Sequence, residues 1–109
     1  MVKIFTSCLR TFRGSDGLDI TYKTNSVFSP TFRLVDDYLK GKIDMDNYTK
    51  EYYKLMRKSY IENRSEWERH LNKNSIVLLC YCSKLSFCHR FLLKDILVKC
   101  GAKYYGEID

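Results

Sequence analysis

The residues best suited to chemistry stand close together in the last third of the chain. Cys80 and Cys82 are followed, after five intervening residues, by the triplet Cys88, His89 and Arg90. Thiols and an imidazole can serve as nucleophile and as acid or base. A guanidinium binds a carboxylate or phosphate through two parallel N–H groups. We therefore expect Cys82, Cys88 and His89 as candidate catalytic residues, with Arg90 binding the ligand.

Three interpretations of this cluster compete. The first is an anion site at the start of a helix, where unpaired backbone N–H groups favour negative charge and thiolate. The second is a zinc site made of Cys80, Cys82, Cys88 and His89, but a single residue between the first two cysteines fits zinc poorly. The third is structural, with Cys80 and Cys100 as small buried residues. We favour the first for the cluster, the structural role for Cys80 and Cys100, and expect no metal or cofactor.

The cluster does not match common catalytic signatures. A phosphatase-like loop has five residues between its cysteine and arginine, whereas seven separate Cys82 from Arg90. Neither a Walker-type phosphate loop nor a GxGxxG segment occurs in the chain. These classes are therefore excluded.

A second group of candidate ligand-binding residues lies near the amino terminus. They are Thr6, Ser7, Arg10, Arg13, Asp19 and Thr21. We expect Thr6 and Ser7 to line the floor of a site and the two arginines to supply charge. For Asp19 two roles stay open. It either holds Arg90 or a ligand hydroxyl, or it bonds its own backbone in a turn.

These residues need strands and helices to position them. An alternating segment predicts a strand over 2–7, and an apolar run without alternation predicts a strand over 75–82 that is covered on both faces. Residues 8–17 form a loop, 18–22 a short extended piece and 102–108 a last strand. Helices are predicted over 31–40, from Asp44 or Asp46 onward, from Asn63 to Leu71, where Trp67 is buried, and over 87–100. Asn63 and Glu66 resemble a capping box.

This order of elements predicts the fold class. Helices between buried strands indicate one α/β domain over residues 1–109, a small three-layer domain with a mainly parallel central sheet flanked by helices. Ligands bind such sheets beyond the carboxyl ends of the strands. The loops after the two main strands, 8–17 and 82–87, are expected to meet there.

Composition indicates the kind of partner, the state of the cysteines and the cellular location. The 109 residues carry a net charge of +6, which favours anionic partners. Five cysteines are an odd number, and three lie within nine residues, so free thiols or a metal fit better than a disulfide framework. The longest apolar run, 76–82, is too short to span a membrane. Because no signal-peptide pattern is present, we expect a cytoplasmic protein without a membrane partner.

Nearly the whole chain resembles a known family. The matching segments are residues 4–21, 28–32, 48–71 and 77–104. They resemble the YeaO-like family, domain of unknown function 488, and in particular its short phage-type members. The hallmark is Leu-Cys followed shortly by Cys-His-Arg, matched by Leu79-Cys80 and by 88–90. The resemblance implies a compact α/β domain and leaves its activity open.

The sequence is compatible with four functions. We favour the binding, with or without processing, of a small anionic nucleotide-like ligand at the sheet edge. In a phage this would fit the sequestering of a host defence signal. The alternatives are a cysteine-dependent enzyme using Cys82 or Cys88 with His89, a nucleic-acid-binding protein with a basic helix over 50–58, and an inhibitor of a host protein. The oligomeric state is not predicted.

Overall fold

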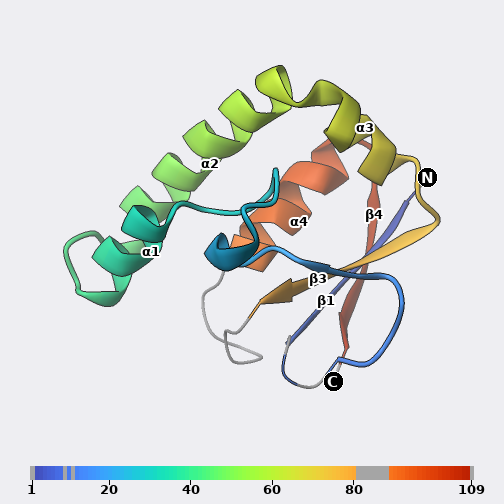
Figure 1. The fold of residues 1–109 in the computed structure, drawn as a ribbon, viewed down its shortest axis with the longest axis horizontal. Coiled ribbons are helices and arrows are strands. Elements are labelled where there is room, and N and C mark those ends of the chain that lie inside the picture. The colour runs from blue at the N-terminus through green and yellow to red at the C-terminus, as the bar shows by residue number, and fades with distance from the viewer. Residues whose placement is uncertain (1, 9, 11, 81–88, 109) are drawn as a thin grey trace.

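The computed structural model describes residues 2–8, 10, 12–80 and 89–108 (Figure 1). Its strands are β1 (Lys3–Cys8), β2 (Gly17–Asp19), β3 (Ser75–Cys80) and β4 (Lys103–Ile108). Its α-helices are α1 (Phe32–Leu39), α2 (Met45–Glu62), α3 (Arg64–Leu71) and α4 (His89–Lys99), and a 3-10 turn covers Tyr22–Thr24. None of the helices described is long and apolar enough to cross a membrane.

The four strands form one sheet in the order β2-β3-β1-β4, and every pairing is parallel. The central pair places Ile4 beside Ile76 and Cys8 beside Cys80. This confirms the predicted α/β fold with a parallel sheet. The unbroken apolar run of β3 is explained by its position, because a central strand is covered on both faces.

The helices lie on one face of this sheet. Helix α4 packs directly on β1, β3 and β4, and α2 packs on α4, so the sheet, α4 and α2 form three successive layers (Figure 1). The steps from β2 to β3 and from β3 to β4 cross the sheet in the same direction, so right-handed connections put their helices on the same side. The connection from β1 to β2 crosses the sheet in the opposite direction, so a right-handed connection there lies on the other face.

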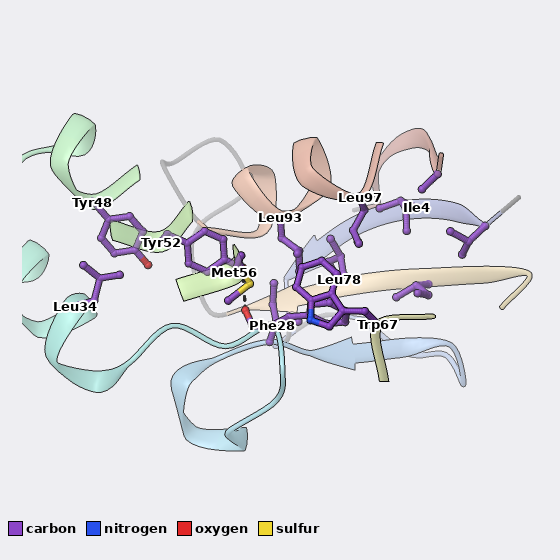
Figure 2. Packing of buried hydrophobic residues seen from close by; sticks show 14 residues of the cluster. Ile4, Phe28, Leu34, Tyr48, Tyr52, Met56, Trp67, Leu78, Leu93 and Leu97 are labelled. Carbon is purple, nitrogen blue, oxygen red and sulfur yellow. Dashed lines mark hydrogen bonds between the residues drawn. The ribbon is translucent and has the colours of Figure 1, made fainter. Parts of the chain in front are cut away.

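The core lies between the sheet and these helices (Figure 2). Ile4 and Leu78 point from the strands toward Leu93 and Leu97 of α4, and the cluster continues to Trp67 of α3. Burial of Trp67 confirms the prediction from the sequence. Burying large apolar side chains is the main force that holds the layers together.

Local signals at the helix starts are partly as predicted. The Asp44 carboxylate accepts a hydrogen bond from the Asn47 amide at 2.8 Å, which settles the choice between Asp44 and Asp46 as the cap. The capping box is wrong. Asn63 precedes α3 but makes no side-chain cap bond, and the Glu66 carboxylate instead accepts from Arg69 at 2.9 Å.

Strand β4 contains an irregularity that matters for the site. Tyr104 lies beside Ile4 and Gly106 lies beside Phe5, so Tyr105 is an extra residue. Gly106 has φ of +124°, a conformation that side chains with a Cβ disfavour. The bulge places Glu107 beside Thr6, on the helix-covered face, where strict alternation would turn it to the other side.

Candidate functional site

Arg90 is the central charged residue at the carboxyl end of the sheet. Its side chain is fully buried at the start of α4. Its Nη2 and Nε donate to the two Glu107 carboxylate oxygens at 3.1 and 3.4 Å, and its Nη1 donates to Cys80 Sγ at 3.1 Å. The guanidinium thus bridges β3 and β4 from inside, and it also lies 4.5 Å from the Phe91 ring centroid.

Glu107 is the residue that the sequence analysis missed. Its side chain is only 13% exposed and forms the ion pair with Arg90. The one signal in the sequence is Gly106, since a glycine inside a strand often marks a bulge. Without the bulge, the predicted alternation puts Glu107 on the wrong face for this pair.

His89 is buried beside β2. Its Nε2 donates to the Ile20 carbonyl oxygen at 2.7 Å, and its ring lies 5.7 Å from that of Tyr52. Burial lowers the pKa of His89 to about 4, although the bond to Ile20 acts in the opposite direction. The imidazole is therefore neutral at neutral pH, and it is poorly suited to give a proton to a ligand there.

Thr6 and Ser7 use their hydroxyls to join β1 to β4. Thr6 Oγ1 and the Tyr104 hydroxyl are 2.7 Å apart, and Ser7 Oγ donates to the Ile108 carbonyl at 2.9 Å. Both residues are fully buried. They lie in the part of the sheet where we predicted the floor of a site, but alternation directs them to opposite faces.

Asp19 adopts the self-bonded turn that was one of its two expected roles. Its Oδ1 accepts from the Thr21 amide at 2.9 Å and from the Thr21 hydroxyl at 2.7 Å. Thr24 Oγ1 in turn donates to the Asp19 carbonyl at 3.0 Å. Such a turn fixes the chain immediately after β2. The carboxylate that holds Arg90 in the described part of the chain is that of Glu107.

Arg10 and Arg13 are exposed on the connection that leaves β1. Arg13 Nη1 donates to the Arg10 carbonyl at 3.3 Å and to the Phe12 carbonyl at 2.9 Å, which folds its guanidinium back toward Arg10. Arg10 follows the carboxyl end of β1 by two residues. Within the described ranges neither arginine forms an ion pair with a carboxylate.

The bonding of Cys80 and the exposure of Cys100 both differ from the prediction. Cys80 is buried in β3 as expected, but its sulfur takes part in a disulfide bond, so the expectation of a free thiol or metal ligand is wrong for it. Cys100 was expected in the core and is exposed, because α4 ends at Lys99 and Cys100 follows the last buried turn. Cys82 and Cys88 lie outside the described residues.

Comparison with known families gives one match. Residues 9–101 match the family model DUF488-N3a, described as the active DUF488-N3 subclade. This confirms the resemblance to the family of domain of unknown function 488. No match to the chain was found among curated proteins or among solved structures.

Proposed function

The chain belongs to the DUF488-N3a family, and we propose that it binds a small anionic, nucleotide-like ligand at the carboxyl-terminal edge of its sheet. The observation that carries the proposal is the pair of exposed guanidinium groups of Arg10 and Arg13 beside that edge. Parallel sheets bind ligands there, and the net charge of +6 favours an anion. The family is the active DUF488-N3 subclade, which supports processing of the ligand as well.

The arginines have different parts in this proposal. Arg10 and Arg13 contact the anion, because their side chains reach solvent. Arg90 does not contact the anion in this proposal. Its buried guanidinium binds Glu107 and Cys80 and so holds β3 and β4 together at this edge. His89 contributes a neutral ring that is hydrogen-bonded to the Ile20 carbonyl, directly after β2. The cytoplasmic location expected from the sequence is part of the same proposal.

Mass spectrometry of small molecules that co-purify with the protein tests this assignment, followed by thermal melts with the mononucleotides. A bound ligand at a hundredfold excess over its Kd stabilises the fold by about 2.7 kcal/mol. We expect Arg10→Gln with Arg13→Gln to lose that gain. The matched control is Lys50→Gln with Lys58→Gln on α2, which removes the same charge and should keep it. Equal loss in the two double variants, or no ligand at all, contradicts the proposal.

A second candidate is a cysteine-dependent enzyme. The sequence favours Cys82 or Cys88 with His89 for it, and one contact in the described residues adds Cys80 as a further candidate thiol. Arg90 Nη1 lies 3.1 Å from Cys80 Sγ, and a cation beside sulfur stabilises a thiolate once the disulfide is reduced. Alkylation rates against pH, measured after reduction in a Cys8→Ser, Cys100→Ser background, test this function. It predicts a thiol pKa below the ordinary value of about 8.5. Ordinary reactivity of all remaining thiols rejects it.

A further inference from the structure

The face of the sheet opposite the helices carries an unusual set of side chains. Alternation and the strand register turn six residues of β1 and β4 to this face. They are Lys3, Phe5, Ser7, Lys103, Tyr105 and Ile108. None of the six is acidic, and two are lysines. This half of the sheet therefore presents aromatic rings and positive charge together.

The other half of this face is covered by the chain itself. A Cβ added at Gly17 would lie 2.7 Å from Leu79 Cδ1 and 2.9 Å from Phe12 Cε2, so these side chains meet over β2 and β3. Leu79 is accordingly buried. Tyr105, by contrast, is 52% exposed. The connection after β1 thus covers the β2–β3 half, whereas Lys3, Lys103 and Tyr105 of the β1–β4 half are exposed.

The exposed ring of Tyr105 lies beside the partly buried ring of Phe5. The centroids of Phe5 and Tyr105 are 5.5 Å apart, with 41° between their planes. Lys3 Nζ and Lys103 Nζ lie 5.6 and 5.8 Å from the centroid of Tyr105. The bulge of β4 supplies Tyr105 as the extra outward residue. Such exposed ammonium–ring contacts are weak and are readily exchanged for others.

We propose that this face, defined by Lys3, Phe5, Lys103 and Tyr105, binds single-stranded nucleic acid. Bases stack on the rings of Tyr105 and Phe5, and the two ammonium groups pair with the phosphates. Stacking suits a single strand because its bases are accessible, whereas a duplex keeps them paired inside. The four residues that define this face do not include Arg10, Arg13 or Arg90, so this inference does not depend on the ligand proposed above.

Fluorescence anisotropy with a labelled oligothymidine of twelve nucleotides tests the stacking. We expect saturable binding that Tyr105→Ala weakens about tenfold, and that Tyr105→Phe retains, since stacking needs only a ring. Tyr105 is half exposed, so circular dichroism should show both variants folded. A duplex of the same length should bind more weakly than the single strand.

The salt dependence tests the charges. Lys3→Gln with Lys103→Gln should reduce the slope of log Kobs against log salt by about 1.4, at about 0.7 per lost phosphate contact on a single strand. Lys50→Gln with Lys58→Gln on α2 removes equal charge from another surface and should leave the slope unchanged. No binding, equal binding of duplex, or equal effects of the two lysine pairs overturns the proposal. So does a dimer that Tyr105→Ala dissociates, because a second copy would then cover the face.

Discussion

The buried ion pair of Arg90 and Glu107 shows that a buried charge requires a partner of opposite charge. Arg90 has no exposed surface, so the loss of water around its guanidinium must be offset by close contacts. Glu107 and Cys80 provide such contacts from two strands. The pair therefore ties the start of α4 to β4, the last strand in the sequence.

Removing the carboxylate should be costly. We expect Glu107→Gln, which keeps the side-chain volume, to lower the free energy of unfolding by about 3 kcal/mol, because it leaves a buried charge without its partner. Urea denaturation at neutral pH measures the change. Glu66→Gln is the matched control, since Glu66 pairs with Arg69 at the surface and exposed pairs contribute at most about 1 kcal/mol. Equal effects of the two substitutions would contradict a structural role for the buried pair.

The histidines should make the fold sensitive to mild acid. Burial lowers the pKa of His89 from 6.5 to about 4, so below pH 6.5 the unfolded chain binds a proton that the folded chain does not. Stability is then complete above pH 6.5 and falls toward pH 4. Between pH 7 and pH 5 His89 accounts for a loss of about 2 kcal/mol.

Burial also lowers the pKa of His70 to about 4, so its contribution must be separated. His70→Gln leaves His89 as the sole histidine. Its unfolding free energy, measured by urea denaturation at several pH values, should still fall by about 2 kcal/mol from pH 7 to pH 5. A flat profile in that variant would show that His89 is not buried in its neutral form.

The sequence predicted which residues lie in the candidate site better than it predicted their contacts. Arg90 and His89 stood out because of their spacing from the cysteines, and the structure places them at the predicted edge of the sheet. Their partners did not stand out. Glu107 depends on a bulge, and the Ile20 carbonyl that binds His89 is a backbone atom with no signature in the sequence.

At the scale of elements, sequence patterns predicted the central strand but missed the cap of one helix and gave no pattern for the shortest strand. The apolar run over 76–82 predicted a central parallel strand, because the absence of alternation means cover on both faces, and the structure has β3 over Ser75–Cys80. The capping box at Asn63 failed because Glu66 has a stronger local partner in Arg69. Strand β2, with three residues, is too short for a pattern and depends on its pairing with β3.

The cap of α2 gives a test at this scale. Asp44→Ala removes the acceptor of the Asn47 amide and should cost about 1 kcal/mol of stability. Asp46→Ala is the control, because Asp46 lies in the first turn but is not the cap, and it loses only the weaker interaction with the helix dipole. Thermal or urea unfolding of the two variants compares them. A larger loss for Asp46→Ala would contradict the assignment of the cap.

At the scale of the whole molecule, one core joins the layers. Trp67 is 1% exposed, its ring packs edge-on against Phe28 at 4.8 Å, and its Nε1 donates to Ser59 Oγ at 3.1 Å (Figure 2). The same cluster reaches Ile4 and Leu78 on the sheet. The described helices lie on one face because of the strand order, which no local pattern in the sequence reveals.

A continuous core predicts a single unfolding transition. Trp67 is the sole tryptophan, so its fluorescence reports the junction of α2, α3 and the sheet, while far-ultraviolet circular dichroism reports all helices. The two urea curves should coincide, with a slope between about 1 and 3 kcal/mol per molar. Trp67→Phe should lower the midpoint without changing the slope of the dichroism curve, because it weakens the core and leaves its extent unchanged. Fluorescence that changes at lower urea than dichroism would instead mean that the helical layers separate from the sheet before it unfolds.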